Sequence, residues 1–361
     1  MSSTTVSERP RILSGVQPSG KLHLGNYFGA IKQHIERQDS GECFYFIADY
    51  HALTSLKEAE EKEAGLAAKN KAIVARPARQ ILADNVRDVA LDYLALGLDP
   101  AKANFFRQSD VPEVCELTWI LGTVSGMGLL ERATSYKDKV ARGLTPNVGL
   151  FTYPILMAAD ILIYRSHLVP VGKDQQQHLE MTRDIAGSFN HQYGEVFPVP
   201  DAVFNEAAVV PGTDGQKMSK SYGNTIEIFA EGKALKSAVM GIVTDSTPVD
   251  APKNPETCNA FALYKLFATA AEQAEMAELY RNPMKGSELR GRPYGYGDAK
   301  ALLLAKIDAY FAAARERRKK LARDPGLVEE VLSAGAKRAR AVAQVTLQLV
   351  RQAVGLHARP V

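Results

Sequence analysis

The chain holds two short segments whose side chains suit the binding of a polyphosphate. The first is the tetrad His-Leu-Gly-Asn at residues 23–26, where helical spacing begins. The second is the pentad Lys-Met-Ser-Lys-Ser at residues 217–221, which follows a glycine-containing stretch. A helix N-terminus favours anions, and paired lysines can stabilise the negative charge that grows on a departing pyrophosphate. Together the two segments indicate chemistry on a nucleoside triphosphate.

Each residue type in these segments has a definite use. His23 and Asn26 can donate hydrogen bonds to phosphate oxygens, and Gly25 lets an adenine or ribose ring approach the backbone. Lys217 and Lys220 act as point charges. Taken alone, the tetrad is more often a capped helix with a buried histidine. An ordinary basic surface loop is the alternative for the pentad, and the exact match over five residues counts against it. Their joint presence in this order favours nucleotide chemistry.

A P-loop is a competing interpretation of the first region. Residues 15–21 satisfy most of that pattern, but Leu22 stands where the pattern needs Ser or Thr to bind magnesium. The helix also begins later than the lysine, near Gly25. The sequence therefore disfavours a P-loop.

Composition and charge limit the class of protein. The 361 residues are 46% hydrophobic and 24% charged, with a net charge of +3, as in ordinary soluble globular proteins. No apolar run is long enough to span a membrane, and the first ten residues lack the apolar core of a secretory signal. The three cysteines are widely spaced, which favours neither disulfides nor a sulfur-bound metal and predicts a cytoplasmic location.

The pattern of apolar residues predicts an α/β fold. Strand-like runs lie at 11–17, 43–49, 104–109 and 168–172 and alternate with helical stretches, which is typical of a Rossmann-like, doubly wound parallel sheet. Ligands bind beyond the carboxyl ends of such strands, where the polar motifs lie. Beyond residue 230 the pattern becomes helical. We expect these helices at 257–281, 297–322, 326–337 and 339–354.

Three segments follow from this pattern. We predict a disordered lead-in at 1–10, a catalytic domain at 11–230 and an all-α C-terminal domain at 231–361, whose final helices could return to the catalytic domain. Residues 281–361 carry a clear excess of Lys and Arg over Asp and Glu. A basic segment on an otherwise acidic chain suggests an anionic partner, although a solvated helix face is an equally good explanation.

The motifs in combination resemble those of the bacterial-type tryptophanyl-tRNA synthetases, which are class I aminoacyl-tRNA synthetases. The resemblance runs from about Arg11 to Leu356. It rests on the segments 14–27, 49–52, 130–132, 153–161, 170–178 and 217–221.

The resemblance implies a tryptophan site. Asp160 is expected to accept a hydrogen bond from the indole N–H, with Met157 packed on the ring. Indole nitrogen only donates, so a residue that selects it must be an acceptor. Tyr153, Gln175 and Gln17 would hold the α-amino and carboxylate groups. His51 would orient the substrate.

The resemblance also implies an ATP site and a two-step reaction. Lys217, Lys220, His23 and Asn26 are the expected catalytic residues. The tryptophan carboxylate would attack the α-phosphorus of Mg-ATP, and the tRNA would then take the acyl group; no protein nucleophile is needed. The expected ATP-binding residues are Gln17, Ser19, Gly25, Asn26, Lys137, Lys139, Gly172, Asp174, Lys217, Met218, Ser219, Lys220 and Ser221.

The implied partners are tRNA(Trp), L-tryptophan and a second copy of the chain in a homodimer, with no membrane. Mg2+ would arrive with ATP, without a dedicated protein metal site. Some family members carry an iron–sulfur cluster on closely spaced cysteines; only Cys258 lies in that region here, so none is predicted. The basic residues offered to tRNA are Arg315, Arg317, Arg318, Lys319, Lys320, Lys337, Arg338 and Arg340.

Three other functions remain open on the sequence. A tyrosyl-tRNA synthetase shares the fold, but the Gln17-Pro-Ser-Gly run and the Met157 to Asp160 helix count against it. A small-molecule nucleotidyltransferase would leave the basic helical segment unexplained. A non-catalytic sensor of tRNA or amino acid would not need leaving-group lysines such as Lys217 and Lys220.

Overall fold

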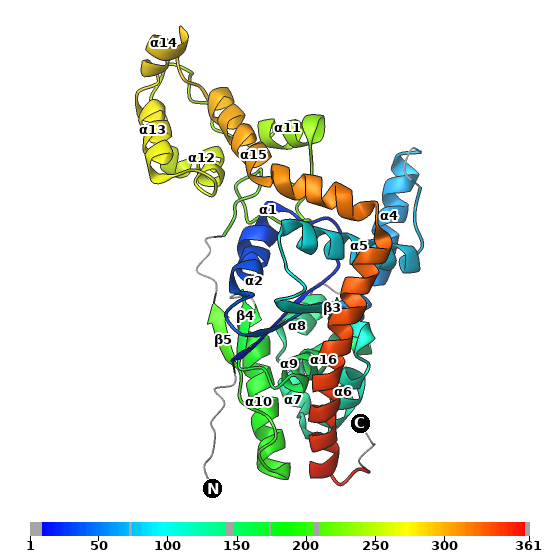
Figure 1. Ribbon diagram of the computed structural model, residues 1–361. Helices are drawn as coiled ribbons and strands as arrows, with labels where there is room; N and C mark the ends of the chain where they lie inside the picture. Colours follow the sequence, from blue (N-terminus) through cyan, green and yellow to red (C-terminus); the bar gives the residue numbers. More distant parts are fainter. Residues whose placement is uncertain (1–8, 72–73, 142–146, 173–174, 205–208, 358–361) are drawn as a thin grey trace. The chain divides into compact units, whose positions relative to one another are not determined.

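The computed structural model describes residues 9–71, 74–141, 147–172, 175–204 and 209–357 (Figure 1). The chain divides into two compact units. Unit 1 comprises Met1–Gly20, Gln33–Asn205 and Leu321–Val361, and unit 2 comprises Lys21–Lys32 and Glu206–Lys320. Most of the predicted lead-in lies outside the described residues. The boundary predicted near residue 230 separates a catalytic from a tRNA-binding domain, and it stays a prediction. The compact units divide the chain at other positions, and residues 321–361 belong to unit 1.

Unit 1 is built on a five-stranded sheet in the order β3-β2-β1-β4-β5, and every neighbouring pair of strands is parallel. The predicted α/β, doubly wound sheet is confirmed. Four strands fall where the sequence predicts them, and β5 was missed because its short segment has no buried position. The strands are β1 (Arg11–Val16), β2 (Glu42–Ile47), β3 (Ala103–Arg107), β4 (Leu168–Val171) and β5 (Asp201–Phe204).

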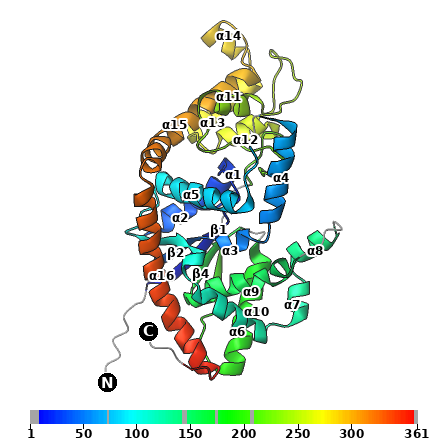
Figure 2. The same ribbon diagram turned by 90° about the vertical axis from the view of Figure 1, so that its right-hand side faces the viewer.

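Helices cover this sheet (Figure 2). Five of six residues in β2 are buried, as expected of a parallel strand covered on both faces. One core joins the strands to helices α6, α9, α10 and α16. The helices that lie mainly in unit 1 are α2 (Lys32–Arg37), α3 (Asp49–Ala52), α4 (Leu56–Lys69), α5 (Ala78–Leu96), α6 (Glu113–Val124), α7 (Met127–Glu131), α8 (Thr134–Ala141), α9 (Val148–Ile163), α10 (Gln176–Tyr193) and α16 (Pro325–Ala353), with a 3-10 turn η2 (Gln108–Asp110).

Helix α16 crosses strand β3 at close range. A Cβ atom on Gly335 would lie 2.0 Å from the carbonyl oxygen of Phe105, so only glycine permits this approach. Ala339 and Ala343, further along the same face, are fully buried. The prediction of separate helices at 326–337 and 339–354 is therefore wrong. One helix continues through residue 338, because the small residues on one of its faces pack closely against β3.

Unit 2 is helical around an aromatic core. Its first helical segment consists of α1 (Leu24–Asn26) and a π-helical turn η1 (Tyr27–Ile31). Tyr27 packs edge to face on Phe311, and Phe28 on Phe267. The predicted helix at 257–281 is broken into shorter pieces. The remaining elements are α11 (Gly232–Met240), η4 (Pro255–Thr257), α12 (Asn259–Tyr264), α13 (Ala270–Arg281), α14 (Lys285–Arg290) and α15 (Tyr296–Ala322).

Candidate functional site

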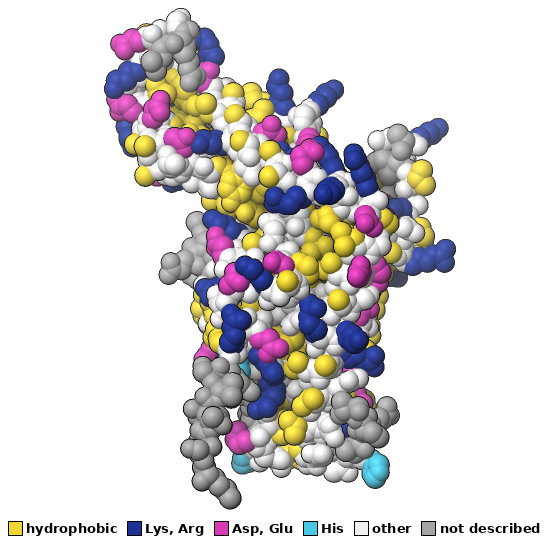
Figure 3. Space-filling model, viewed as in Figure 1, with side chains coloured by type: hydrophobic (Ala, Val, Ile, Leu, Met, Phe, Trp, Pro, Cys, Tyr) yellow, Lys and Arg dark blue, Asp and Glu magenta, His cyan; other side chains and the backbone are white. Residues whose placement is uncertain are grey.

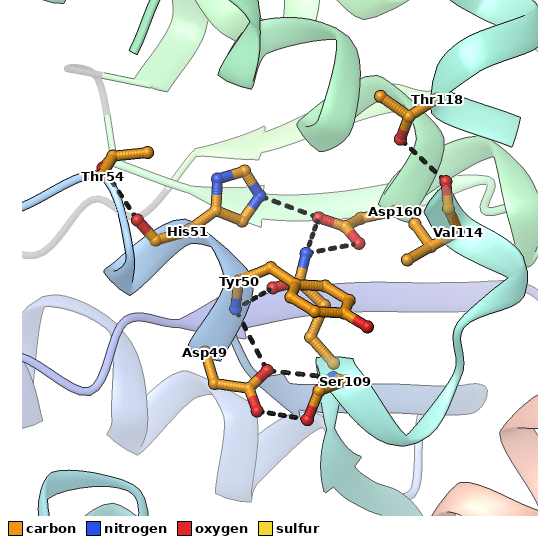
Figure 4. A network of polar contacts seen from close by, with 9 residues as sticks. Asp49, Tyr50, His51, Thr54, Ser109, Val114, Thr118 and Asp160 are labelled. Atoms are coloured by element: carbon orange, nitrogen blue, oxygen red, sulfur yellow. Dashed lines mark hydrogen bonds and ion pairs between the residues drawn. The ribbon is translucent and has the colours of Figure 1, made fainter. Parts of the chain in front are cut away.

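The carboxyl ends of β2 and β3 bring a polar network together in unit 1. The two strands run parallel with Ile47 opposite Arg107, so the residues that follow each strand emerge at the same edge of the sheet. Asp49 begins α3, and its Oδ1 accepts hydrogen bonds from the backbone N–H of Ser109 at 2.9 Å and of Tyr50 at 3.2 Å. The Ser109 hydroxyl donates to Oδ2 of Asp49. These bonds hold the two strand ends in register (Figure 4).

Asp160 on α9 lies at the centre of this network (Figure 4). The His51 ring contacts its Oδ2 through Nε2 at 2.9 Å, and the Gln108 amide donates to Oδ1 at 2.9 Å and to Oδ2 at 2.8 Å. The side chain is buried. Burial raises the pKa of Asp160 above its ordinary value, while the hydrogen bonds from His51 and Gln108 act in the opposite direction. The site is therefore a buried acceptor with two fixed protein partners.

Three predicted tryptophan-site residues share one face of α9, because positions 153, 157 and 160 are spaced by a helical turn. The rings of Tyr153 and His51 meet edge to face with centroids 6.2 Å apart. The Tyr153 hydroxyl forms a short hydrogen bond with Nε2 of His178. Met157 is half-buried against the core. The structure thus brings Tyr153, His51 and Asp160 together.

The other predicted unit 1 residues lie near other strand ends. Gln17 follows β1, and its amide donates to the Ser55 hydroxyl at 3.4 Å. The Gln175 backbone N–H donates to the carbonyl oxygen of Gly172 at 2.9 Å. The Ser19 N–H donates to the carbonyl oxygen of Gln17 at 2.9 Å.

Two predicted ATP residues fall outside what the structure describes. These are Asp174 and the side chain of Lys139. Lys137, which was predicted with Lys139, is exposed on α8. Its role stays a prediction.

A cavity of about 440 Å³ adjoins the network in unit 1. Tyr50 and Thr54 of the network form part of its wall, and Tyr153 lines it as well. Asp160 and Met157 are not among its described lining residues. The lining is Tyr50, Leu53, Thr54, Cys115, Thr118, Asn147, Gly149, Thr152, Tyr153 and Leu156.

The predicted phosphate tetrad begins the first helix of unit 2. The His23 N–H donates to Oδ1 of Asn26 at 3.1 Å, which commits the amide oxygen and leaves the amide N–H groups for other acceptors. His23 is buried, and its Nδ1 has no hydrogen-bond partner among the described residues. Burial, and secondarily the positive charge of Lys220, lowers the pKa of His23 to about 4. The ring is therefore neutral near pH 7.

The tetrad and the pentad meet in unit 2. A Cβ atom on Gly25 would lie 3.0 Å from the His23 ring and 3.4 Å from Cβ of Met218, so the glycine fills the space between the two motifs. Met218 is buried and anchors the pentad. Lys217 and Ser221 are exposed, while Ser219 and Lys220 are half-buried. The two segments therefore lie against each other in unit 2, and their joint role in binding ATP stays a prediction.

Asn224 organises the pentad from a buried position. Its Oδ1 accepts from the Ser219 N–H at 2.8 Å, and its amide donates to Asp214 at 2.7 Å and to the carbonyl oxygen of Lys217 at 3.2 Å. A Cβ atom on Gly212 would lie 2.2 Å from this amide, so Gly212 makes room for it. The loop is held by Asn224, and the lysines project from it.

Sequence reasoning missed Gln108, Asn224, Asp214 and His178. Gln108 lay within a predicted strand, and its place at the carboxyl end of that strand was the signal that could have identified it. Asn224 follows the pentad by three residues, but only the folded turn shows which backbone groups it satisfies.

The described part of the chain offers no group of three or more His, Cys, Asp or Glu side chains that could hold a metal ion. The absence of an iron–sulfur cluster stays a prediction. None of the described helices is long and apolar enough to cross a bilayer.

Comparison with known proteins places this geometry in context. The profile of the family "tRNA synthetases class I (W and Y)" matches residues 5–311. The chain is 52% identical to a tryptophan–tRNA ligase of Fusobacterium nucleatum, covering 96% of this chain and 98% of the relative, and 50% identical to one of Rhodopirellula baltica, covering 96% and 99%. The fold is similar to the crystal structure of the Campylobacter jejuni tryptophanyl-tRNA synthetase complexed with ADP and tryptophan. That comparison has a TM-score of 0.83 and 47% identity, over 96% of this chain and 100% of that one.

Proposed function

Because the chain belongs to the class I family of tryptophanyl- and tyrosyl-tRNA synthetases, we propose that it is a tryptophan–tRNA ligase. It activates L-tryptophan with ATP and transfers the amino acid to the 3′ end of tRNA(Trp). The observation that carries the choice of amino acid is the buried Asp160 carboxylate, a fixed acceptor for a ring N–H. About 50% identity to tryptophan–tRNA ligases along nearly the whole chain supports the same choice and does not favour the tyrosyl alternative.

In the first step a carboxylate oxygen of tryptophan forms a bond to the α-phosphorus of ATP. The bond from that phosphorus to the bridging oxygen breaks, and the electron pair leaves with pyrophosphate. Lys217 and Lys220 stabilise the charge that grows on the leaving group. His23 is neutral near pH 7, so its ring can donate to a phosphate oxygen without adding a charge, and the amide N–H groups of Asn26 can do the same.

Tryptophan lies with its indole N–H toward Asp160 and its ring against Met157. Tyr153, Gln175 and Gln17 hold the α-amino and carboxylate groups. His51 orients Asp160, which its ring contacts at 2.9 Å. A site built to accept a ring N–H rejects phenylalanine, because the buried acceptor would be left unpaired.

The adenosine end of ATP contacts Gly172 and Asp174, with Gln17, Ser19 and Gly25 close to the nucleotide. Met218, Ser219 and Ser221 complete the pentad around the phosphates, and Lys137 and Lys139 add charge there. Mg2+ enters bound to ATP as part of the substrate. The absence of a side chain on Gly25 lets the His23 and Met218 segments pack together, which supports a joint role of the two motifs.

The second step needs tRNA(Trp), and we propose that the segment 231–361 reads its anticodon in a cytoplasmic homodimer. Several of the basic residues predicted to contact tRNA are already engaged with other groups of the protein. Arg315 is buried and pairs with Asp308 within unit 2, and Arg338 and Arg340 are engaged with Asn104 and Glu113 within unit 1. Lys320 and Lys337 are exposed. On the face drawn in Figure 3, basic side chains are interspersed with acidic ones.

The test is amino-acid-dependent ATP–pyrophosphate exchange with each of the twenty amino acids and no tRNA. We expect exchange with tryptophan alone. Exchange with tyrosine instead would keep the mechanism and overturn the role of Asp160. No exchange with any amino acid would contradict the ligase function and favour a sensor or a nucleotidyltransferase.

A further inference from the structure

Gln108 is a buried amide that the proposed mechanism does not use. It lies directly after β3, and only 2% of its surface is exposed. Its Oε1 accepts a hydrogen bond from the Tyr50 backbone N–H at 3.1 Å. A backbone N–H can only donate, so this bond fixes which end of the amide faces Tyr50. The amide N–H2 group must then face the other way.

The N–H2 group faces the Asp160 carboxylate and donates to both of its oxygens, at 2.9 Å to Oδ1 and 2.8 Å to Oδ2. His51 adds a third contact, and it goes to Oδ2 at 2.9 Å. The two oxygens are therefore unequal. Among the described residues, Oδ2 has two partners and Oδ1 has one.

The difference in the number of partners indicates which oxygen of Asp160 can accept a hydrogen bond from the substrate. A carboxylate has about four acceptor positions, two on each oxygen. His51 and Gln108 together satisfy Oδ2, while Oδ1 keeps one acceptor position. A ring N–H that enters this site has a single well-placed acceptor available, which is Oδ1.

We propose that Gln108 is a positioning residue for amino-acid selection, which holds the Asp160 carboxylate so that Oδ1 is presented to the indole N–H. This inference rests on the proposed role of Asp160. The amide acts through Asp160 and does not touch the reacting atoms. Without it, the carboxylate keeps only its contact with His51 and can rotate, and the selection for a ring N–H weakens.

The experiment compares tryptophan with its benzothiophene analogue, in which sulfur replaces the ring N–H. The ratio of kcat/KM for the two substrates in ATP–pyrophosphate exchange measures how strongly the site selects the N–H. In Gln108→Met, which keeps the length of the side chain and removes both hydrogen-bonding ends, we expect this ratio to fall about tenfold. The loss should lie in the KM for tryptophan, with kcat and the KM for ATP little changed.

A structural role alone would lower activity with both substrates equally and leave the ratio unchanged, which would overturn the proposal. Gln108→Glu gives a second test if the methionine variant folds poorly, because it keeps an acceptor for the Tyr50 N–H but repels the Asp160 carboxylate. It should also lower the ratio. The matched control is Gln80→Met, since Gln80 donates to the carboxylate of Asp84 at 2.8 Å on the exposed surface of α5. It should leave the ratio unchanged.

A double-mutant cycle distinguishes the role proposed for Gln108 from the role proposed for Asp160, on which it rests. If Asp160→Asn alone leaves the ratio unchanged, the assignment of Asp160 to the indole fails. If Asp160→Asn lowers the ratio and Gln108→Met does not, only the role of Gln108 fails. If Gln108 acts through Asp160, adding Gln108→Met to Asp160→Asn should lower the ratio no further, because coupled residues are not additive.

Discussion

The network around Asp160 in unit 1 and the pentad around Lys220 in unit 2 are built in opposite ways. In the network the charged group is buried and most of its acceptor positions are already occupied by protein donors. In the pentad the anchor, Asn224, is buried, whereas Lys217 is exposed and Lys220 is half-buried. The difference shows two ways to handle charge. Under the proposed function, the first fixes an acceptor before the substrate arrives, and the second keeps cations accessible for a charge that appears only during reaction.

The contrast follows from what each region must recognise. Distinguishing an indole from a phenyl ring depends on one hydrogen bond, so the acceptor must be rigid and shielded from water. Stabilising pyrophosphate depends on charge rather than on shape, and lysine suits a mobile, highly charged group. Variants in the two regions should therefore change different kinetic constants.

The largest effect should come from Lys220→Ala. Removing a cation that stabilises charge in the transition state should lower kcat for ATP–pyrophosphate exchange by about 10²- to 10³-fold. The KM for tryptophan should change by no more than about twofold, because the lysine does not serve the amino acid. The measurement is steady-state exchange at saturating ATP. The control is Lys236→Ala, an exposed lysine on α11. An effect mainly on the KM for tryptophan would contradict the division between the two regions.

Asp160→Asn should affect the other constant. Loss of the charged acceptor should lower kcat/KM for tryptophan by roughly 10- to 100-fold, the cost of a hydrogen bond to a charged group. The change should lie mainly in KM. Activity with the benzothiophene analogue should change little. Asp184→Asn, on the exposed face of α10, serves as the control. A pure loss of kcat would show that Asp160 serves the chemistry rather than selection.

Asn224→Ala tests whether the pentad needs its anchor. The variant removes hydrogen bonds to Ser219, Lys217 and Asp214. We expect kcat to fall about tenfold, less than for Lys220→Ala, because the lysines remain but are less well placed. Trypsin should also cleave faster after Lys217 or Lys220. Asn282→Ala removes an exposed amide that donates to Glu278, and should change neither quantity. Unchanged cleavage in Asn224→Ala would mean that the loop is held by other contacts.

The smallest effect is expected in the pH dependence of the free energy of unfolding. Burial lowers the pKa of His23 to about 4 in the folded chain, below the ordinary value of 6.5. Between these values the unfolded state binds more protons, so the stabilisation is present above pH 6.5 and is lost as the pH falls toward 4. At a pH of about 5.5 the loss should be about 1 kcal/mol. Urea unfolding at several pH values measures it.

His23→Gln should reduce this pH dependence without abolishing it. His34 in unit 1 is also buried, which lowers its pKa to about 4 and gives a contribution of the same sign. His191→Gln, at an exposed position on α10, should leave the pH dependence unchanged. An unaltered slope in His23→Gln would mean that His23 titrates normally in the folded chain.

The sequence was sufficient for the features that depend on local pattern. Four buried strands and the two phosphate motifs were predicted, because apolar runs and short polar motifs are visible without a fold. Strand β5 was missed because its segment of 4 residues is too short to show a pattern, although three of them are apolar. The single helix α16 was divided at residue 338, because its packing against β3, where Gly335 meets Phe105, is visible only in the folded chain.

The candidate site was predictable to the same degree. Asp160 and Lys220 stand in recognisable motifs, and their assignment as site residues stays a prediction. Gln108 and Asn224 act by satisfying backbone and carboxylate groups that are distant in sequence or hidden in a turn. Only the folded chain shows which groups those are.

The packing of α16 against β3 has a consequence for synthesis on the ribosome. The strand is made early, whereas the helix that covers it is the last element of the chain, after all of unit 2. A nascent chain that stops before Pro325 therefore leaves an edge strand of the sheet without its covering helix. Uncovered strands pair readily with other chains. We expect unit 1 to complete its fold only after α16 has left the ribosome, and chains truncated or stalled before Pro325 to depend on chaperones.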